Sequence, residues 1–86
     1  MNRKSRHVLN KVIMEVVENQ LRDGNPPETK QTLDRLLKDG IEEREAKRLI
    51  ACVVTSEIYD IMRFEQPYNR ERFVNALHRL PQLPWD

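Results

Sequence analysis

The residue with the clearest potential for chemistry is Glu57, which stands among apolar residues in the longest predicted helix. Val53, Val54, Ile58 and Ile61 surround it at helical spacing, so the carboxylate falls near the centre of the apolar stripe. A carboxylate buried there needs a cationic or hydrogen-bonding partner, or it keeps its proton. With a raised pKa, such a group transfers protons or binds a ligand.

Two roles for Glu57 follow from the sequence. In an enzyme, a second polar group such as Arg48, Tyr59 or Asn10 would converge on the carboxylate. In a structural role, Glu57 would pair with Arg48 or Lys11, or lie at a subunit interface. We favour the structural role and expect no catalysis, because no second catalytic group stands at a recognisable spacing. The candidate buried polar site comprises Glu57, Arg48 and Asn10, and we predict a basic or hydroxyl partner for Glu57 from another helix or subunit.

The histidines and the single cysteine offer no further site. His7 and His78 lie near opposite ends of the sequence, and Cys52 has no histidine near it in sequence. A zinc site needs several closely placed ligands, and a nucleophilic cysteine needs a neighbouring cation or histidine. We therefore expect no metal, no cofactor and no catalytic residue. A lone thiol with a packing role is consistent with a reducing cytoplasm.

Basic residues form the one pattern that suggests nucleic-acid binding. They gather in an N-terminal arm and on the fourth predicted helix, and such side chains bind phosphates. The candidate basic patch consists of Arg3, Lys4, Arg6, Lys11, Arg70 and Arg72, with Arg79 nearby in sequence. No aromatic residue is interleaved for base stacking. Weak nucleic-acid binding through the arm and the fourth helix is therefore the alternative function.

Apolar spacing predicts an all-α fold, a compact bundle of about four helices at 3–22, 28–39, 42–64 and 70–79. Gly24 and the Pro26-Pro27 pair end the first helix, Gly40 ends the second, and Asn69 is suited to cap the fourth. The predicted inward faces are Val8, Leu9, Val12, Ile13, Val16, Val17 and Leu21; Leu33, Leu36 and Leu37; Ala46, Leu49, Ile50, Val53, Val54, Ile58, Ile61 and Met62; and Phe73, Val74, Leu77 and Leu80.

Composition limits the class of protein. The 86 residues are predicted to form one domain, 1–86, and the formal net charge of +1 gives no global field that favours nucleic acid or membrane. No stretch approaches the about 20 apolar residues of a membrane span. Polar residues from Asn10 onward interrupt the N-terminal apolar run, which argues against a signal peptide. We expect a cytoplasmic protein with an extended C-terminal tail whose Trp85 folds back over the bundle.

Several short strings together resemble a bacterial family of small helical domains of unknown function. They are Val17-Glu18-Asn19-Gln20-Leu21, Pro26-Pro27, Arg35-Leu36, Glu45-Ala46, Ile50 and Ile58-Tyr59, within roughly residues 7–77. The resemblance implies a bacterial cytosolic protein with a helical fold, and it implies no activity. Many members carry histidines four residues apart on the first and third helices, which could make an inter-helix metal site. This chain has Asn10 and Met14, then Arg44 and Arg48, at those places, so no metal site is expected.

The leading interpretation is a non-enzymatic protein-interaction module that binds another protein or itself. The apolar face of the first helix, from Val8 to Val17 and Leu21, is wider than the other helices of a short bundle can cover. Exposed apolar surface of that kind usually marks an interface. A homodimer is the first expectation, because symmetric dimers are the commonest oligomers.

Overall fold

The computed structural model describes residues 3–86, with side chains from Asn10 onward, and this range folds into four helices. They are α1 (Arg3–Asp23), α2 (Pro27–Lys38), α3 (Glu43–Phe64) and α4 (Arg70–Arg79). The predicted all-α fold is confirmed, and each predicted boundary lies within one residue of the observed one.

Local chemistry explains where the helices stop and start. Gly24 and Gly40 adopt left-handed conformations with φ of 64° and 92°, which glycine accepts without the steric cost of a Cβ. The side chain of Asn69 accepts a hydrogen bond from the backbone N–H of Arg72 and caps α4 as predicted. These signals are local in sequence, and for that reason they could be identified without a structure.

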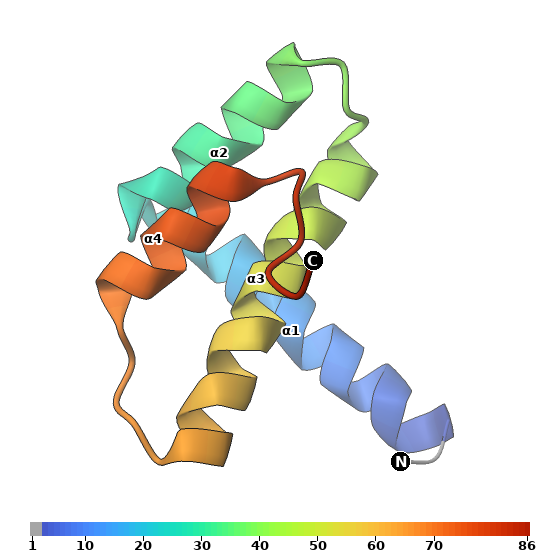
Figure 1. Cartoon of the computed structure of the whole chain (residues 1–86). Coiled ribbons are helices and arrows are strands. Elements are labelled where there is room, and N and C mark those ends of the chain that lie inside the picture. The colour runs from blue at the N-terminus through green and yellow to red at the C-terminus, as the bar shows by residue number, and fades with distance from the viewer. Residues whose placement is uncertain (1–2) are drawn as a thin grey trace.

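Helix α3 is the central element of the fold (Figure 1). It packs against α1, α2 and α4, and α2 in turn contacts both α1 and α4. Within the described residues, α1 and α4 do not contact each other. The molecule measures 35 × 28 × 28 Å along its principal axes. At about 1.5 Å per residue, the 22 residues of α3 form a helix that crosses nearly the whole molecule.

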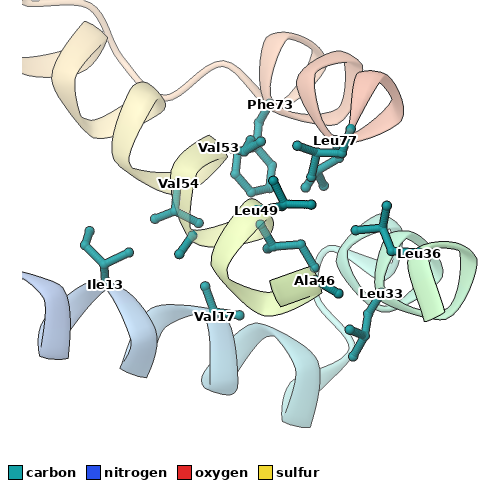
Figure 2. Close-up of a cluster of buried hydrophobic side chains, with 13 residues drawn as sticks. Ile13, Val17, Leu33, Leu36, Ala46, Leu49, Val53, Val54, Phe73 and Leu77 are labelled. Carbon is teal, nitrogen blue, oxygen red and sulfur yellow. The ribbon is translucent and has the colours of Figure 1, made fainter. Parts of the chain in front are cut away.

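The core lies where the four helices converge on the middle of α3. Figure 2 shows Ile13 and Val17 of α1 approaching α3 from one side, with Leu36 of α2 and Phe73 of α4 on other sides. The buried apolar residues are Ile13, Val17, Leu33, Leu36, Ala46, Leu49, Ile50, Ala51, Val53, Val54, Phe73, Leu77 and Leu80. Most of the predicted inward faces are thus confirmed for the residues whose side chains are described.

Three predicted inward residues are in error. Leu37 is exposed, Met62 is 75% exposed, and Val12 is 48% exposed. Helical periodicity places each of these residues on the apolar side of its helix. Periodicity does not show whether a neighbouring helix covers that position, and here none does so fully. Conversely, Thr29 and Thr32 are buried on α2 and were not predicted to be inside.

The C-terminal tail forms turns, which corrects the prediction of an extended segment. Backbone hydrogen bonds run from Gln82 N–H to the Arg79 carbonyl and from Asp86 N–H to the Leu83 carbonyl. Leu83 packs against the core, and the tail turns back across α3, as Figure 1 shows in red. The fold-back is confirmed, but Trp85 remains 60% exposed and does not cover the core.

Candidate functional sites

Glu57 is buried, with 6% of its surface exposed, and both carboxylate oxygens are hydrogen-bonded. Oε1 accepts from the backbone N–H of Asn69 at 3.1 Å and from Nη2 of Arg72 at 2.8 Å. Oε2 accepts from Nε of Arg72 at 2.8 Å. The pair is bidentate, which is the strongest arrangement of an arginine and a carboxylate. It joins the C-terminal half of α3 to the first turn of α4.

These contacts keep Glu57 ionised. Burial by itself raises the pKa of the carboxyl, but the hydrogen bonds from Arg72 and from the Asn69 backbone outweigh burial and lower the pKa below its ordinary value. The hydrogen bond to Glu57 in turn raises the pKa of Arg72. A carboxylate in this state is a poor proton donor and a weak base at neutral pH.

The predicted burial of Glu57 and its basic partner from another helix are confirmed, but the partner is neither Arg48 nor Lys11. Arg72 is fifteen residues away in sequence, and only the α3–α4 connection brings it to Glu57. Arg48 instead forms an ion pair with Glu45 at 2.6 Å on the surface of α3. The predicted trio of Glu57, Arg48 and Asn10 is therefore not assembled, because Arg48 and Asn10 lie on a different side of α3 from Glu57.

An open cavity of about 380 Å³ lies beside Glu57, between α3, α4 and the tail. Its charged lining is mixed: Glu57, Asp60, Glu71, Arg72 and Arg79. Among the described residues, no buried side-chain nitrogen or oxygen lacks a hydrogen-bond partner. The buried carboxylate of Glu57 beside the cavity is thus fully hydrogen-bonded within the protein.

A second, larger groove of about 730 Å³ lies between α1 and α3. We call it the α1–α3 groove. Its apolar lining comprises Ile13, Met14, Ala51, Cys52 and Trp85. Its polar lining comprises Asn10, Glu42, Arg44, Glu45, Arg48 and Thr55. No sequence pattern predicted it, because it depends on how α1 crosses α3 and on where the tail places Trp85.

The four positions that the predicted resemblance matches to histidines all line the α1–α3 groove. They are Asn10, Met14, Arg44 and Arg48 in this chain. The fold thus brings the two helix pairs together, but two arginines, an amide and a thioether are not a zinc ligand set. Among the residues that the structure describes, no three His, Cys, Asp or Glu side chains gather as a metal site would require.

Cys52 lies half-buried in the same groove, with its Sγ 3.9 Å from Nη1 of Arg48. Burial raises the pKa of the thiol and outweighs the opposing effect of Arg48. The thiol is therefore mostly protonated at neutral pH, which is unfavourable for a nucleophile. His78 is exposed at the end of α4, and His7 lies outside the residues whose side chains are described.

The two α4 arginines of the candidate basic patch bind carboxylates of the protein itself. Nη2 of Arg70 lies 2.9 and 3.0 Å from the two oxygens of Glu28, and Arg72 binds Glu57. Lys11 is exposed on α1, a helix that does not contact α4. Arg3, Lys4 and Arg6 lie outside the described side chains. Of the described members of the candidate patch, two are thus paired within the protein, and Lys11 lies on a helix that does not contact theirs.

Comparison of the chain with protein-family models, with curated proteins and with solved structures gives no match. The resemblance to a bacterial helical family therefore stays a prediction. Among residues 3–86, no helix combines the length and the apolar character needed to cross a bilayer.

Proposed function

We propose that this protein is a non-catalytic protein-interaction module that self-associates. The observation that carries the proposal is the apolar surface that α1 and α3 leave open between them. The α1–α3 groove has apolar residues from both helices, and Trp85 stands on it with 60% of its surface exposed. A cytoplasmic, bacterial setting accords with the resemblance and with the lone Cys52 thiol.

Apolar surface left exposed to water carries a free-energy cost. Burial of apolar surface contributes roughly 25 cal/mol per Å². A small chain exposes a large share of its surface, and it gains most by covering apolar areas with a partner. Tryptophan is among the residues that most often dominate binding energy at interfaces, so an exposed Trp85 beside an apolar groove favours a docking role.

The state of Glu57 supports a binding role more than a catalytic one. Arg72 and the Asn69 backbone occupy both of its oxygens, and the lowered pKa leaves no proton to transfer near neutral pH. The binding of Arg70 and Arg72 to carboxylates gives no support to the nucleic-acid alternative.

Sedimentation equilibrium over a concentration series tests the proposal. We expect the mean mass to rise from that of one chain, 10.3 kDa, toward twice that value as concentration increases. A single-chain mass at every concentration up to several hundred micromolar, of the order that weak dimers require, would contradict self-association.

A further inference from the structure

We propose that residues 81–86 form a strap that docks on the bundle through Leu83, completes the α1–α3 groove with Trp85, and lifts away beyond Leu80. The strap is the part of the C-terminal tail that follows Leu80. When it is docked, Trp85 lines the groove and Leu83 packs against the core. When it lifts, both contacts are lost together. Its effect on association rests on the proposed function, whereas the docking of the strap does not.

Leu80 is the fixed point from which the strap extends. Its side chain is fully buried, and its N–H donates to the Leu77 carbonyl. Its own carbonyl accepts a hydrogen bond from Nη1 of Arg35 at 2.8 Å. The chain is thus held firmly up to Leu80, and a movement of the strap leaves α4 in place.

Beyond Leu80 the attachment of the chain is sparse. The two backbone hydrogen bonds of the strap are local, from Gln82 N–H to the Arg79 carbonyl and from Asp86 N–H to the Leu83 carbonyl. Within residues 10–86, no hydrogen bond or ion pair joins the strap to α1, α2 or α3. Leu83 is the strap residue that packs against the hydrophobic core. A segment held by so few contacts opens at a small cost in free energy compared with the whole fold.

The strap is shared by the two cavities described above. It crosses α3 (Figure 1), where Gln82 and Pro84 line the cavity beside Glu57 and Trp85 lines the α1–α3 groove. One movement of the strap therefore alters both cavities. A molecule that binds either cavity with the strap docked shifts the strap toward that state, and this couples the two cavities to each other.

The composition of the strap keeps the docked and lifted states close in free energy. Pro81 and Pro84 fix φ at about −65°, so the lifted strap has little conformational entropy to lose when it docks. The ring of Trp85 is exposed over more than half of its surface, so it adds only part of its area to the docked state. Leu83 therefore contributes most of the apolar burial that holds the strap.

The docked strap is the form that we expect to self-associate. Docking places Trp85 on the groove, where an exposed tryptophan is suited to dominate the binding energy. Leu83 does not line the groove, yet it sets the fraction of chains in which the groove is complete. A lifted fraction lowers the apparent affinity in proportion, so the strap regulates the interaction surface.

Nuclear magnetic resonance tests the docking at a concentration at which sedimentation shows single chains. Trp85 is the sole tryptophan, so its indole N–H gives one signal. In the wild type we expect nuclear Overhauser contacts from the indole ring to methyl groups of Ile13 or Met14. Leu83→Ala should raise the ratio of lifted to docked strap about tenfold, the effect of roughly 1.4 kcal/mol of lost apolar burial. The Overhauser contacts should weaken, and the indole signal should move toward its position in the unfolded chain.

Gln82→Ala is the matched control, because Gln82 is the neighbour of Leu83 in the strap but is exposed and does not pack against the core. Its indole signal should match that of the wild type, and Leu83→Met, which keeps an apolar side chain, should stay close to it. Backbone signals of α1–α4 should be unchanged in all three variants. Overhauser contacts that are absent in the wild type, or equally strong in Leu83→Ala, would overturn the proposal. Loss of the helix signals in Leu83→Ala would likewise contradict a strap that moves independently.

Sedimentation equilibrium separates the strap from the proposed self-association. We expect Leu83→Ala to raise the dimer dissociation constant by at least about twofold, because fewer chains have a docked strap, and Gln82→Ala to leave it unchanged. If the wild type stays a single chain while the resonance result is as expected, self-association fails and the strap stands. If the wild type dimerises and Leu83→Ala lifts the strap without changing the constant, the regulatory effect of the strap is refuted.

Discussion

At the scale of single residues, the ion pair of Glu57 with Arg72 is the dominant polar feature of the interior. Glu57 is almost fully buried, while the side chain of Arg72 is 35% exposed. The pair therefore reaches from the core to the solvent rather than being enclosed. This geometry limits the desolvation cost that makes fully buried ion pairs unfavourable.

Removal of the Glu57 carboxylate should destabilise the fold. We expect Glu57→Ala to lower the free energy of unfolding by about 2 kcal/mol, because charge-assisted hydrogen bonds are lost and the Asn69 N–H is left without its acceptor. Glu57→Leu should also destabilise, while Glu57→Gln, which can still accept, should be milder. Urea denaturation gives the values.

Glu45→Ala is the matched control for Glu57→Ala. Glu45 also pairs with an arginine, Arg48, but this pair lies on the surface, where ion pairs contribute little to stability. We expect its denaturation midpoint to stay near that of the wild type. Equal decreases in the free energy of unfolding for the two variants would mean that the burial of Glu57 adds nothing to stability.

The same carboxylate predicts a pH dependence of stability. The pKa of Glu57 in the folded protein is lowered from its ordinary 4.5, so the ionised form favours folding. This stabilisation is complete above the ordinary pKa and is lost as pH falls through the lowered folded value. Melting curves of wild type and Glu57→Gln should therefore converge below pH 4.5. A difference in melting temperature that stays constant from pH 7 to pH 3 would refute the assignment.

At the scale of elements, Arg35 of α2 is hydrogen-bonded to the C-terminal end of α4. Its Nη1 donates to the Leu80 carbonyl at 2.8 Å and its Nη2 donates to the Leu77 carbonyl at 3.1 Å. The last carbonyls of a helix lack the N–H donor that lies four residues further along in the helix interior. A cation from a neighbouring element can bind these carbonyls, and the negative end of the helix dipole also favours it. The tail begins at this point, and Arg35 therefore also positions the tail.

Loss of the two Arg35 hydrogen bonds should destabilise α4 more than the other helices. We expect Arg35→Ala to destabilise by about 1–2 kcal/mol, the range for hydrogen bonds to a charged group. Hydrogen exchange should show faster exchange in α4 than in α1. Lys38→Ala, an exposed cation on the same helix, is the control and should change neither measurement. A uniform rise in exchange across all four helices would contradict a local role.

The cap of α4 provides a separate test. Asn69→Ala removes the acceptor for the Arg72 backbone N–H and should cost about 1 kcal/mol, while Asn69→Asp should retain most of the stability. Asn75→Ala is the control, because Asn75 is exposed within the same helix and alanine is the better helix former. Thermal denaturation in which Asn75→Ala loses as much as Asn69→Ala would rule out capping as the cause.

At the scale of the whole molecule, self-association would couple stability to concentration. Only folded chains would form the dimer. Mass action therefore raises the melting temperature as protein concentration rises. We expect a rise of a few degrees between about 1 and 100 µM for the wild type. For Trp85→Ala, which removes the exposed ring from the α1–α3 groove, the rise should be smaller. A melting temperature independent of concentration in both proteins would argue against a folded dimer.

The sequence by itself determined the elements. Apolar spacing, the glycines at 24 and 40, and the Asn69 cap each act within a few residues, so the four helices and their ends could be predicted. The break in the α3 stripe at Glu57 likewise predicted a buried carboxylate with a basic or hydroxyl partner, because an unpaired buried charge is too costly to persist, and the partner is the basic residue Arg72.

Only the tertiary structure decided which residues meet. The choice of Arg72 over Arg48 as the partner of Glu57 depends on the path of the α3–α4 connection, which no local signal encodes. The exposure of Val12 and Met62 depends on how far neighbouring helices reach, and the α1–α3 groove depends on the angle at which α1 crosses α3. Periodicity fixes the direction of a side chain on its own helix, whereas contact between helices depends on their placement in space.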